Sequence, residues 1–342
     1  MRARRPRSQV QVERKNSLKI SNWLVTGAAG FIGSHIVEYL LVNDQNVVAL
    51  DNFSTGNERN IEQVMEIAGG NAAGRFRLIR GDVRDYETCK AACSGVDFVL
   101  HHAALASVPL SLEKPLETNS VNVTGFLNIL TASKESNVKR FIYASSSAVY
   151  GDDQYQPKTE QKVGTPLSPY AASKSINEIY AATFNNIYDL ECVGLRYFNV
   201  FGPRQHPEGA YAAVIPRWFK ALMKKEPIII YGDGESTRDF CYVKDIVKAN
   251  ICAVSTENKR AFGNIFNIGL GKQTSLNELF EIVKSIVAPK SEIKPQYTAF
   301  REGDIRHSVA NIDSAIKVLE FKPDYSLKQG LAEAVEWYKE NL

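Results

Sequence analysis

A glycine-rich turn at Thr26–Gly33, with the sequence TGAAGFIG, constrains this chain more than any other stretch. It follows a short apolar run and opens a segment, Phe31–Leu41, whose apolar residues recur at helical spacing. A strand, a glycine turn and a helix in this order are typical of a dinucleotide-binding unit. Gly27 permits the tight turn, Gly30 lets the backbone approach a pyrophosphate, and Gly33 lets the helix pack closely on the strand.

An acidic residue stands where such a unit needs one. Asp51 follows the apolar run Asn46–Leu50, at the end of the next predicted strand. A carboxylate in this position can accept a hydrogen bond from a ribose hydroxyl of adenosine. The residues that follow, NFSTG, include no basic side chain that would hold a 2′-phosphate. The sequence therefore predicts binding of NAD rather than NADP.

Apolar, strand-like runs alternate with helical patterns through the first two thirds of the chain. The predicted strands lie at 22–26, 46–51, 75–80, 96–101, 140–145 and 191–197. The segments between them are mostly long enough for crossover helices, so we expect an α/β fold with a Rossmann-type, doubly wound parallel sheet. Ligands of such sheets bind at the carboxyl ends of the strands.

The regular alternation of strand-like runs and helical patterns ends near residue 200. Helical patterns are expected at Val214–Lys224, 274–288 and 327–340, a strand-to-helix pattern at Asp239–Val254 and a strand at Asn264–Ile268. We expect a flexible basic arm at 1–17, an NAD-binding domain at 18–200 with returns near 239–256 and 264–269, and a smaller, interleaved substrate domain within 201–342.

Composition excludes several classes of protein. Among 342 residues, 23% are charged and the net charge is only +3, much of it in the arm, which lacks the apolar segment of a signal peptide. We expect no nucleic-acid partner, and no stretch is apolar enough for a membrane span. Five cysteines without paired close spacing indicate reduced thiols and a cytoplasmic enzyme. Cys89 with Cys93, and His101 with His102, lack further ligands nearby in sequence, so no metal is expected.

The residues that suggest catalysis follow the fifth predicted strand. Ser146 lies at its end, and Tyr170 and Lys174 lie four residues apart at the start of a predicted helix, so the latter two share a helix face. A tyrosine pKa of about 10 must fall to about 7 for use as a base, a change of roughly 4 kcal/mol. One cation about 4 Å away supplies about that much at an effective dielectric near 20. We therefore expect Lys174 to activate Tyr170, with Ser146 sharing the proton.

Several ordered motifs together resemble a known family. They are TGAAGFIG, DNFSTG, GDV, HHAAL, SSSAVYG, YAASK, LRYFNVFGPRQ, TRDFCYV and FREGDIRHS, and they span about residues 20 to 340. The chain resembles the extended short-chain dehydrogenases/reductases and, among them, the UDP-hexose 4-epimerases. It is most similar to bacterial epimerases that act on N-acetylated UDP-hexosamines for surface polysaccharides.

The resemblance implies a redox-neutral reaction with tightly bound NAD. Tyr170 would take the proton of the sugar 4-hydroxyl while C4 gives hydride to NAD. The 4-keto sugar would turn over in the pocket, and hydride would return to its other face. The protein would position the reactants and tune pKa values, because the hydride chemistry belongs to the cofactor.

The resemblance also implies two sets of contacts. The cofactor set is Gly27, Gly30, Phe31, Ile32, Gly33, Asp51, Asn52, Ser54, Thr55, Gly56, Asp82, Val83, His102, Ala104, Tyr170, Lys174, Tyr197 and Val200. The substrate set is Ser107, Asn122, Ser146, Ser147, Asn199, Gln205, Ala213, Val214, Tyr231, Arg238, Arg301, Asp304 and Ser308. Within it, Arg238 and Arg301 match diphosphate-binding arginines, whose fixed forks suit phosphate oxygens. Asp304 would orient a ribose or a neighbouring arginine.

Two departures from the family bear on specificity. Galactose-specific relatives carry a lysine where this chain has Ala106, and some carry a tyrosine where it has Ser308. The small side chain of Ser308 leaves room for a 2-acetamido group, which favours UDP-GlcNAc and UDP-GalNAc over UDP-Glc and UDP-Gal. A UDP-uronic acid 4-epimerase differs mainly in what faces C6 and stays open as an alternative.

Other readings are weaker. A sugar-nucleotide 4,6-dehydratase would need an Asp-Glu pair where this chain has Ser147-Ala148, and the same positions argue against uronic-acid decarboxylases. A catalytically inactive NAD-binding regulator would commonly lack the Tyr or the Lys, and both are present. The resemblance further implies a homodimer formed through helices at about 115–136 and 169–188.

Overall fold

The computed structural model describes residues 19–206, 213–300 and 305–341. Seven parallel strands form its central sheet, in the order β11-β6-β5-β4-β1-β2-β3. Their bounds are β1 Asn22–Thr26, β2 Asn46–Asp51, β3 Phe76–Arg80, β4 Phe98–His101, β5 Arg140–Ser146, β6 Glu191–Tyr197 and β11 Asn264–Ile268. The chain reverses its direction of winding between β1 and β4, so the predicted doubly wound sheet is confirmed.

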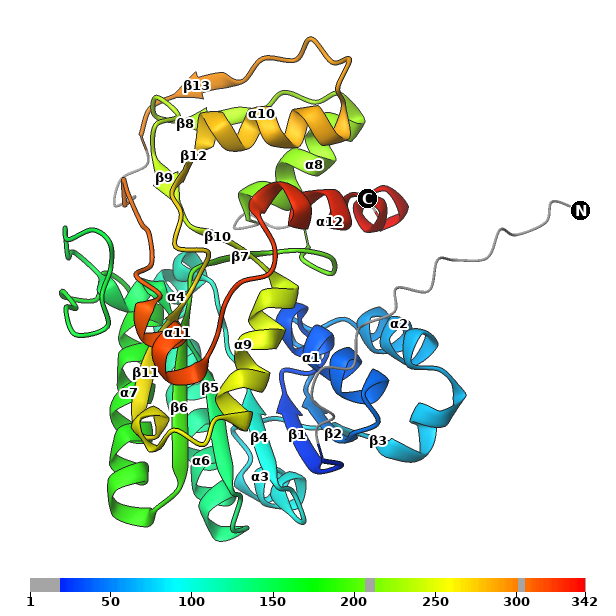
Figure 1. Cartoon of the computed structure of the whole chain (residues 1–342), viewed down its shortest axis with the longest axis vertical. Helices are drawn as coiled ribbons and strands as arrows, with labels where there is room; N and C mark the ends of the chain where they lie inside the picture. Colours follow the sequence, from blue (N-terminus) through cyan, green and yellow to red (C-terminus); the bar gives the residue numbers. More distant parts are fainter. Residues whose placement is uncertain (1–18, 207–212, 301–304, 342) are drawn as a thin grey trace, which may run out of the picture.

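Helices cover both faces of this sheet (Figure 1). One face packs against α1 (Phe31–Val42), α9 (Val243–Ser255) and α11 (Asp313–Leu319). The other packs against α3 (Tyr86–Cys93), α6 (Gly125–Glu135) and α7 (Pro169–Tyr188). Adjacent residues of β1 alternate between the two cores, with Val25 in the first and Leu24 in the second. Side chains that point alternately to both faces explain why these strands read as continuous apolar runs.

A smaller lobe lies at one end of the sheet and is built largely from the last third of the chain (Figure 1). Its apolar core joins α8 (Val214–Lys224), α10 (Leu276–Val287) and α12 (Leu327–Asn341). Short strand pairs complete it: β7 (Asn199–Phe201) with β10 (Phe240–Tyr242), β9 (Thr237–Arg238) with β12 (Thr274–Ser275), and β8 (Ile229–Tyr231) with β13 (Gln296–Thr298). The remaining helices are α2 (Glu58–Ala68), α4 (Val108–Glu113) and α5 (Pro115–Asn119).

Helix α9 covers one face of the sheet and β11 forms an edge strand, in the segments where returns to the sheet are predicted. The predicted domain boundary at residue 200 stays a prediction, and the basic arm 1–17 lies outside the described residues. In the described part of the chain, no helix has the length and apolar character needed to cross a membrane. No cluster of three or more His, Cys, Asp or Glu side chains among those residues is placed to hold a metal ion.

Candidate active site

The glycine turn between β1 and α1 forms a tight cradle in which a side chain would not fit. Gly27 has φ +66°, and a Cβ there would lie 2.8 Å from the Ala103 nitrogen. A Cβ on Gly33 would lie 2.1 Å from the Gly27 carbonyl oxygen. Gly30 precedes α1, so the N–H groups of the first helical turn face the turn without intrahelical partners. The residues present therefore fit a pyrophosphate at this helix N-terminus.

Asp51 ends β2 beside this cradle. Its Oδ2 accepts a hydrogen bond from the Ala29 N–H at 2.8 Å, and its Oδ1 accepts one from the Phe53 N–H at 2.7 Å. Burial raises the pKa of the Asp51 carboxyl, and these two N–H donors act in the opposite direction. Gly56 closes the following loop against Asp51, and a Cβ there would lie 2.9 Å from Asp51 Oδ1. The carboxylate is thus fixed where a ribose hydroxyl can reach it.

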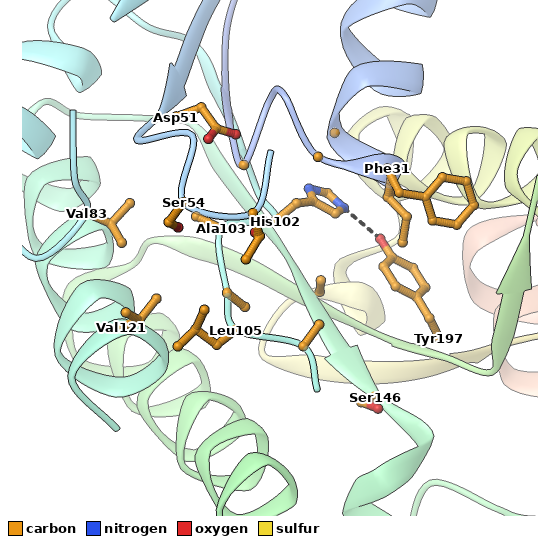
Figure 2. Close-up of a pocket in the computed structure, with 18 of the residues that line it drawn as sticks. Phe31, Asp51, Ser54, Val83, His102, Ala103, Leu105, Val121, Ser146 and Tyr197 are labelled. Carbon is orange, nitrogen blue, oxygen red and sulfur yellow. Dashed lines mark hydrogen bonds between the residues drawn. The ribbon is translucent and has the colours of Figure 1, made fainter. Parts of the chain in front are cut away.

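The first cavity lies along the carboxyl ends of β1, β2, β4, β5 and β6. Figure 2 shows Asp51 and Ser146 at opposite ends of it, with Val83 and Val121 along one side. The predicted residues that line it are Gly27, Gly30, Phe31, Ile32, Gly33, Asp51, Asn52, Ser54, Thr55, Val83, His102, Ala104, Ser146, Tyr170, Lys174, Tyr197 and Val200. The cavity therefore brings the glycine cradle and the suspected catalytic residues into one site.

Two members of the predicted cofactor set, Gly56 and Asp82, do not line the first cavity. Asp82 accepts hydrogen bonds from Asn52 Nδ2 at 2.8 Å and from Arg84 Nη2 at 2.6 Å. Hydrogen bonds from Arg84 are the main reason that the pKa of Asp82 falls to about 2. This carboxylate is thus ionised and holds Asn52, which itself lines the cavity.

His102 and Tyr197 meet in the wall of the first cavity (Figure 2). His102 Nε2 lies 3.0 Å from Tyr197 Oη, and Asn250 Nδ2 donates to the same hydroxyl at 2.8 Å. Burial lowers the pKa of His102 to about 4, so the imidazole is neutral at physiological pH. His102 is therefore uncharged and is hydrogen bonded to Tyr197. It forms part of the cavity wall and adds no positive charge near Lys174.

Tyr170 and Lys174 point from the first turns of α7 toward the end of β5. Lys174 Nζ donates to the Ala144 carbonyl at 2.9 Å, and burial lowers the pKa of Lys174 to about 8. Burial raises the pKa of Tyr170, while a hydrogen bond with Ser146 lowers it. A cation beside Tyr170 lowers the pKa of the phenol, whereas desolvation of the phenolate raises it. The three groups are together, but burial in this structure raises the pKa that we expected to be lowered.

A buried ion pair behind this group was not predicted. Glu178, one turn after Lys174 on α7, binds Arg196 of β6 through two hydrogen bonds of 2.8 Å. The Ser145 hydroxyl also donates to Glu178, and Arg196 Nη1 donates to Tyr150 Oη at 3.1 Å. The spacing of four residues between Lys174 and Glu178 indicates that both lie on one face of α7. It does not reveal that Arg196 lies opposite Glu178. The pair fastens α7 to the ends of β5 and β6.

A second cavity adjoins the first and shares Val200 with it. It lies between β7, α8, β8 and β9, and the predicted substrate residues that line it are Asn199, Gln205, Ala213, Val214, Tyr231 and Arg238. Gln205 Nε2 donates to the Val200 carbonyl at 2.9 Å, while its buried Oε1 has no hydrogen-bond partner among the residues that the structure describes. An unpartnered buried acceptor in the wall of a cavity suits a ligand that donates a hydrogen bond.

Other predicted substrate residues are placed differently. Ser107 caps α4 by accepting from the Leu110 N–H, and Asn122 holds both the N–H and the carbonyl of Leu105. Neither of them lines a cavity described above, and the same holds for Ser147 and the buried Ser308. Arg301 and Asp304 lie outside the described residues.

Several residues of the first cavity were missed as contacts. They are Leu50, Gly81, Ala103, Leu105, Ala106, Val121, Ala144, Ser145 and Phe198. Most of them adjoin predicted contacts at strand ends, so their position at or just after the ends of β2, β3, β4, β5 and β6 was the signal that could have found them. Val121 is an exception, because its place in a π-helical turn at Ser120–Thr124 between α5 and α6 is visible only in the structure.

Comparison with known proteins gives a consistent result. Residues 23–269 match the NAD dependent epimerase/dehydratase family. The chain is 40% identical over 320 residues to a putative UDP-glucose 4-epimerase of Methanocaldococcus jannaschii, covering 93% of this chain and 98% of that protein. It is 34% identical over 325 residues to a UDP-glucuronate 4-epimerase of Thermodesulfobacterium geofontis, covering 94% and 97%. A UDP-N-acetylglucosamine 4-epimerase from Methanobrevibacter ruminantium M1, solved in complex with UDP-N-acetylmuramic acid, superposes with a TM-score of 0.87 at 40% identity, covering 95% of this chain and 100% of that one.

Proposed function

This chain belongs to the NAD dependent epimerase/dehydratase family, and we propose that it interconverts UDP-GlcNAc and UDP-GalNAc by NAD-dependent epimerisation at C4. Its relatives are UDP-sugar 4-epimerases of the extended short-chain dehydrogenase/reductase family. The observation that carries the proposal is one continuous site. The glycine cradle with Asp51 and the Ser146, Tyr170 and Lys174 group line a cavity that adjoins a second one lined by Arg238.

In this proposal the residues of α7 and β5 move the proton. Tyr170 accepts the proton of the sugar 4-hydroxyl and later returns it, and the Lys174 ammonium stabilises the phenolate. Ser146, which lines the same cavity as Tyr170, holds the 4-oxygen in line with it. NAD, when bound, supplies the hydride acceptor and a positively charged nicotinamide. Because the cavity walls are largely apolar, these charges interact more strongly than they would in water.

The second cavity suits the nucleotide part of the substrate. Arg238 presents a guanidinium there, and the Gln205 amide and the Asn199 side chain offer neutral polar groups. A guanidinium fork binds diphosphate oxygens through paired, charge-assisted hydrogen bonds. We assign the UDP group to this cavity and the hexose to the junction near Val200, which places C4 toward Tyr170. Arg301 and Asp304 are proposed as further contacts on sequence grounds alone.

Ser308 and Ala106 support the choice of an acetylated sugar. Ala106 lines the first cavity, and Ser308 follows His307, whose imidazole Nδ1 lies 3.0 Å from Thr237 Oγ1 beside Arg238. The small side chain of Ala106 leaves volume in that cavity. Ser308 is buried and lines neither cavity, so it supports an acetylated sugar on sequence grounds, because it stands where some galactose-specific relatives carry a tyrosine. The similarity to a UDP-glucuronate 4-epimerase favours a second candidate, a UDP-uronic acid substrate, for which the cavity would have to accept a carboxylate at C6.

The test is an incubation of the purified protein, without added NAD, with UDP-GalNAc, UDP-Gal or UDP-glucuronate, followed by chromatographic separation of the C4 epimers. Faster conversion of UDP-GalNAc supports the proposal. The variant Ser308→Tyr should lose UDP-GalNAc conversion while keeping UDP-Gal conversion, and the retained UDP-Gal conversion is the internal control that the variant folds. Faster conversion of UDP-glucuronate would establish the second candidate instead.

The helices α5 and α7 present an apolar face that suits a homodimer. Leu116 of α5 is 86% exposed, and Ile179 and Ile187 of α7 are 65% and 64% exposed. Exposed apolar side chains grouped on packed helices are typical of an interaction site. In the proposed dimer, Ile179→Glu should shift the mass measured by light scattering from two chains to one. The five cysteines are unpaired thiols, which supports a proposed cytoplasmic location.

A further inference from the structure

Asp239 is a buried carboxylate with an unusual set of partners. It lies between β9 and β10, directly after Arg238, and its side chain is completely buried. Its Oδ1 accepts from the Leu270 N–H at 2.7 Å, and its Oδ2 accepts from the Gly271 N–H at 2.9 Å and the Ala310 N–H at 3.1 Å. Among the ion pairs formed by the described residues, none involves this carboxylate. Within the described parts of the chain, only backbone amides bind this carboxylate.

These amides come from chain segments that are far apart in sequence. Leu270 and Gly271 follow the edge strand β11, while Ala310 belongs to the segment before α11, and Asp239 is itself part of the β9–β10 connection. Figure 1 shows β9, β10 and β12 running between the sheet and the smaller lobe. One carboxylate thus joins three segments where the two parts of the molecule meet.

Two of the joined segments carry a residue of the proposed substrate site, and the neighbouring strand β7 carries a third. Arg238 precedes Asp239, and the Asp239 carbonyl accepts from the Asn199 N–H at 3.0 Å. Ser308 lies two residues before Ala310, and its N–H donates to the Thr237 carbonyl at 3.2 Å. The positions of Arg238, Asn199 and Ser308 relative to one another therefore depend on the same hydrogen-bonded cluster.

We propose that Asp239 is a positioning residue that sets the affinity of the second cavity for the UDP group, a role that rests on the proposed function. It does not touch the ligand. It holds the backbone that presents Arg238 and Asn199, and it anchors the segment of Ser308. A carboxylate suits this task because it accepts several hydrogen bonds at once and donates none when ionised. Burial raises its pKa to about 6, and the three N–H donors favour the ionised form.

The chain offers a matched control in Asp245. This carboxylate is also buried, and it accepts only backbone N–H groups, from Asp324 at 2.7 Å and Tyr325 at 3.3 Å. Burial raises the pKa of Asp245 to about 6 as well. It fastens α9 to the segment before α12, however, and lines neither cavity. Asp245→Asn therefore makes the same chemical change to another buried carboxylate, but on α9 instead of the β9–β10 connection.

The experiment measures UDP binding to the purified, NAD-containing protein by titration calorimetry, together with KM and kcat for the UDP-sugar that turns over. In Asp239→Asn the amide N–H₂ group faces N–H donors, so we expect UDP to bind about tenfold or more weakly. KM should rise by a similar factor, while kcat at saturation and the NAD content stay near those of the wild type. Asp245→Asn should bind UDP like the wild type.

A second variant keeps the test decisive if Asp239→Asn does not fold. A Cβ on Gly269 would lie 2.7 Å from Asp239 Oδ2 and 3.1 Å from the Ala310 Cβ. Gly269→Ala should therefore move the carboxylate away from its amides and weaken UDP binding in the same direction. Wild-type affinity for UDP in the folded Asp239 variant, or in Gly269→Ala if the former does not fold, would overturn the role of Asp239. Failure of the wild-type protein to bind UDP would instead overturn the assignment of the second cavity, and this role with it.

Discussion

The two adjoining cavities are built by different means. The first lies along one edge of the parallel sheet, and its lining comes from the ends of neighbouring strands and the turns that follow them. The second is formed by short strands, α8 and the beginning of α10, from segments between residues 199 and 276. The first is therefore fixed by the fold of the sheet itself, whereas the second depends on a few tertiary hydrogen bonds such as those of Asp239. We expect variants in the two regions to separate chemistry from binding.

The largest effect on this comparison should come from removing the proposed base. Tyr170→Phe keeps the ring but loses the hydroxyl, so turnover should fall about 100- to 10,000-fold. NAD content and the affinity for UDP should stay nearly unchanged, because phenylalanine keeps the ring in the first cavity, the glycine cradle is intact, and Tyr170 does not line the second cavity. Single-turnover assays on the purified protein measure turnover, and calorimetry measures the affinity for UDP. Near-normal turnover in this variant would exclude Tyr170 as the base.

Removing the buried ion pair should destabilise the first region as a whole. Glu178→Gln leaves Arg196 buried without its partner charge, which costs about 3–5 kcal/mol of the free energy of unfolding. Urea denaturation checks this value. The exposed pair of Lys244 and Glu333 is the control, since Glu333→Gln should change the free energy of unfolding by about 0–1 kcal/mol. A similar small loss in both variants would show that the Glu178–Arg196 pair does not stabilise the fold.

In the second region, the corresponding change affects affinity. Arg238→Met removes the guanidinium proposed to bind the diphosphate, so KM for the UDP-sugar should rise about 10- to 100-fold. Arg238→Lys keeps the charge but loses the fork and should give an intermediate value. Steady-state kinetics on both variants measure KM and kcat, and the NAD content is the control. A decrease in kcat at unchanged KM would show that Arg238 acts in the chemical step. It would contradict the proposed separation of chemistry in the first cavity from binding in the second.

The smallest effect should be a shift with pH. Burial lowers the pKa of Lys174 to about 8, so its ammonium loses the proton as the pH rises through that value. The cation that stabilises the Tyr170 phenolate is then lost, and kcat should decline above about pH 8. Lys174→Arg carries a charge that does not titrate in this range, so its lower kcat should lack this decline. Persistence of the decline in that variant would assign it to another group.

Local patterns were sufficient for most of the first region. The spacing of the glycines, the acid at the end of β2 and the i, i+4 relation of Tyr170 and Lys174 are all features of short stretches. Parallel strands bring their carboxyl ends to one edge, so these stretches had to meet once the sheet was recognised. The bounds of β1, β2, β6 and β11 match the predicted runs for the same reason, since each is a buried apolar segment.

The tertiary structure decided what local patterns do not contain. Glu178 and Arg196 lie on a helix and a strand that the sequence predicted separately, and their contact depends on how α7 docks. Asp239 and Ala310 are 71 positions apart, and the backbone amides that bind the carboxylate leave no mark in the residue types. The pKa of Tyr170 also required the fold, because desolvation depends on everything that packs around the phenol. The sequence alone determined the sheet and the cofactor and predicted the reacting groups, while packing brought Glu178 to Arg196 and Asp239 to its backbone donors.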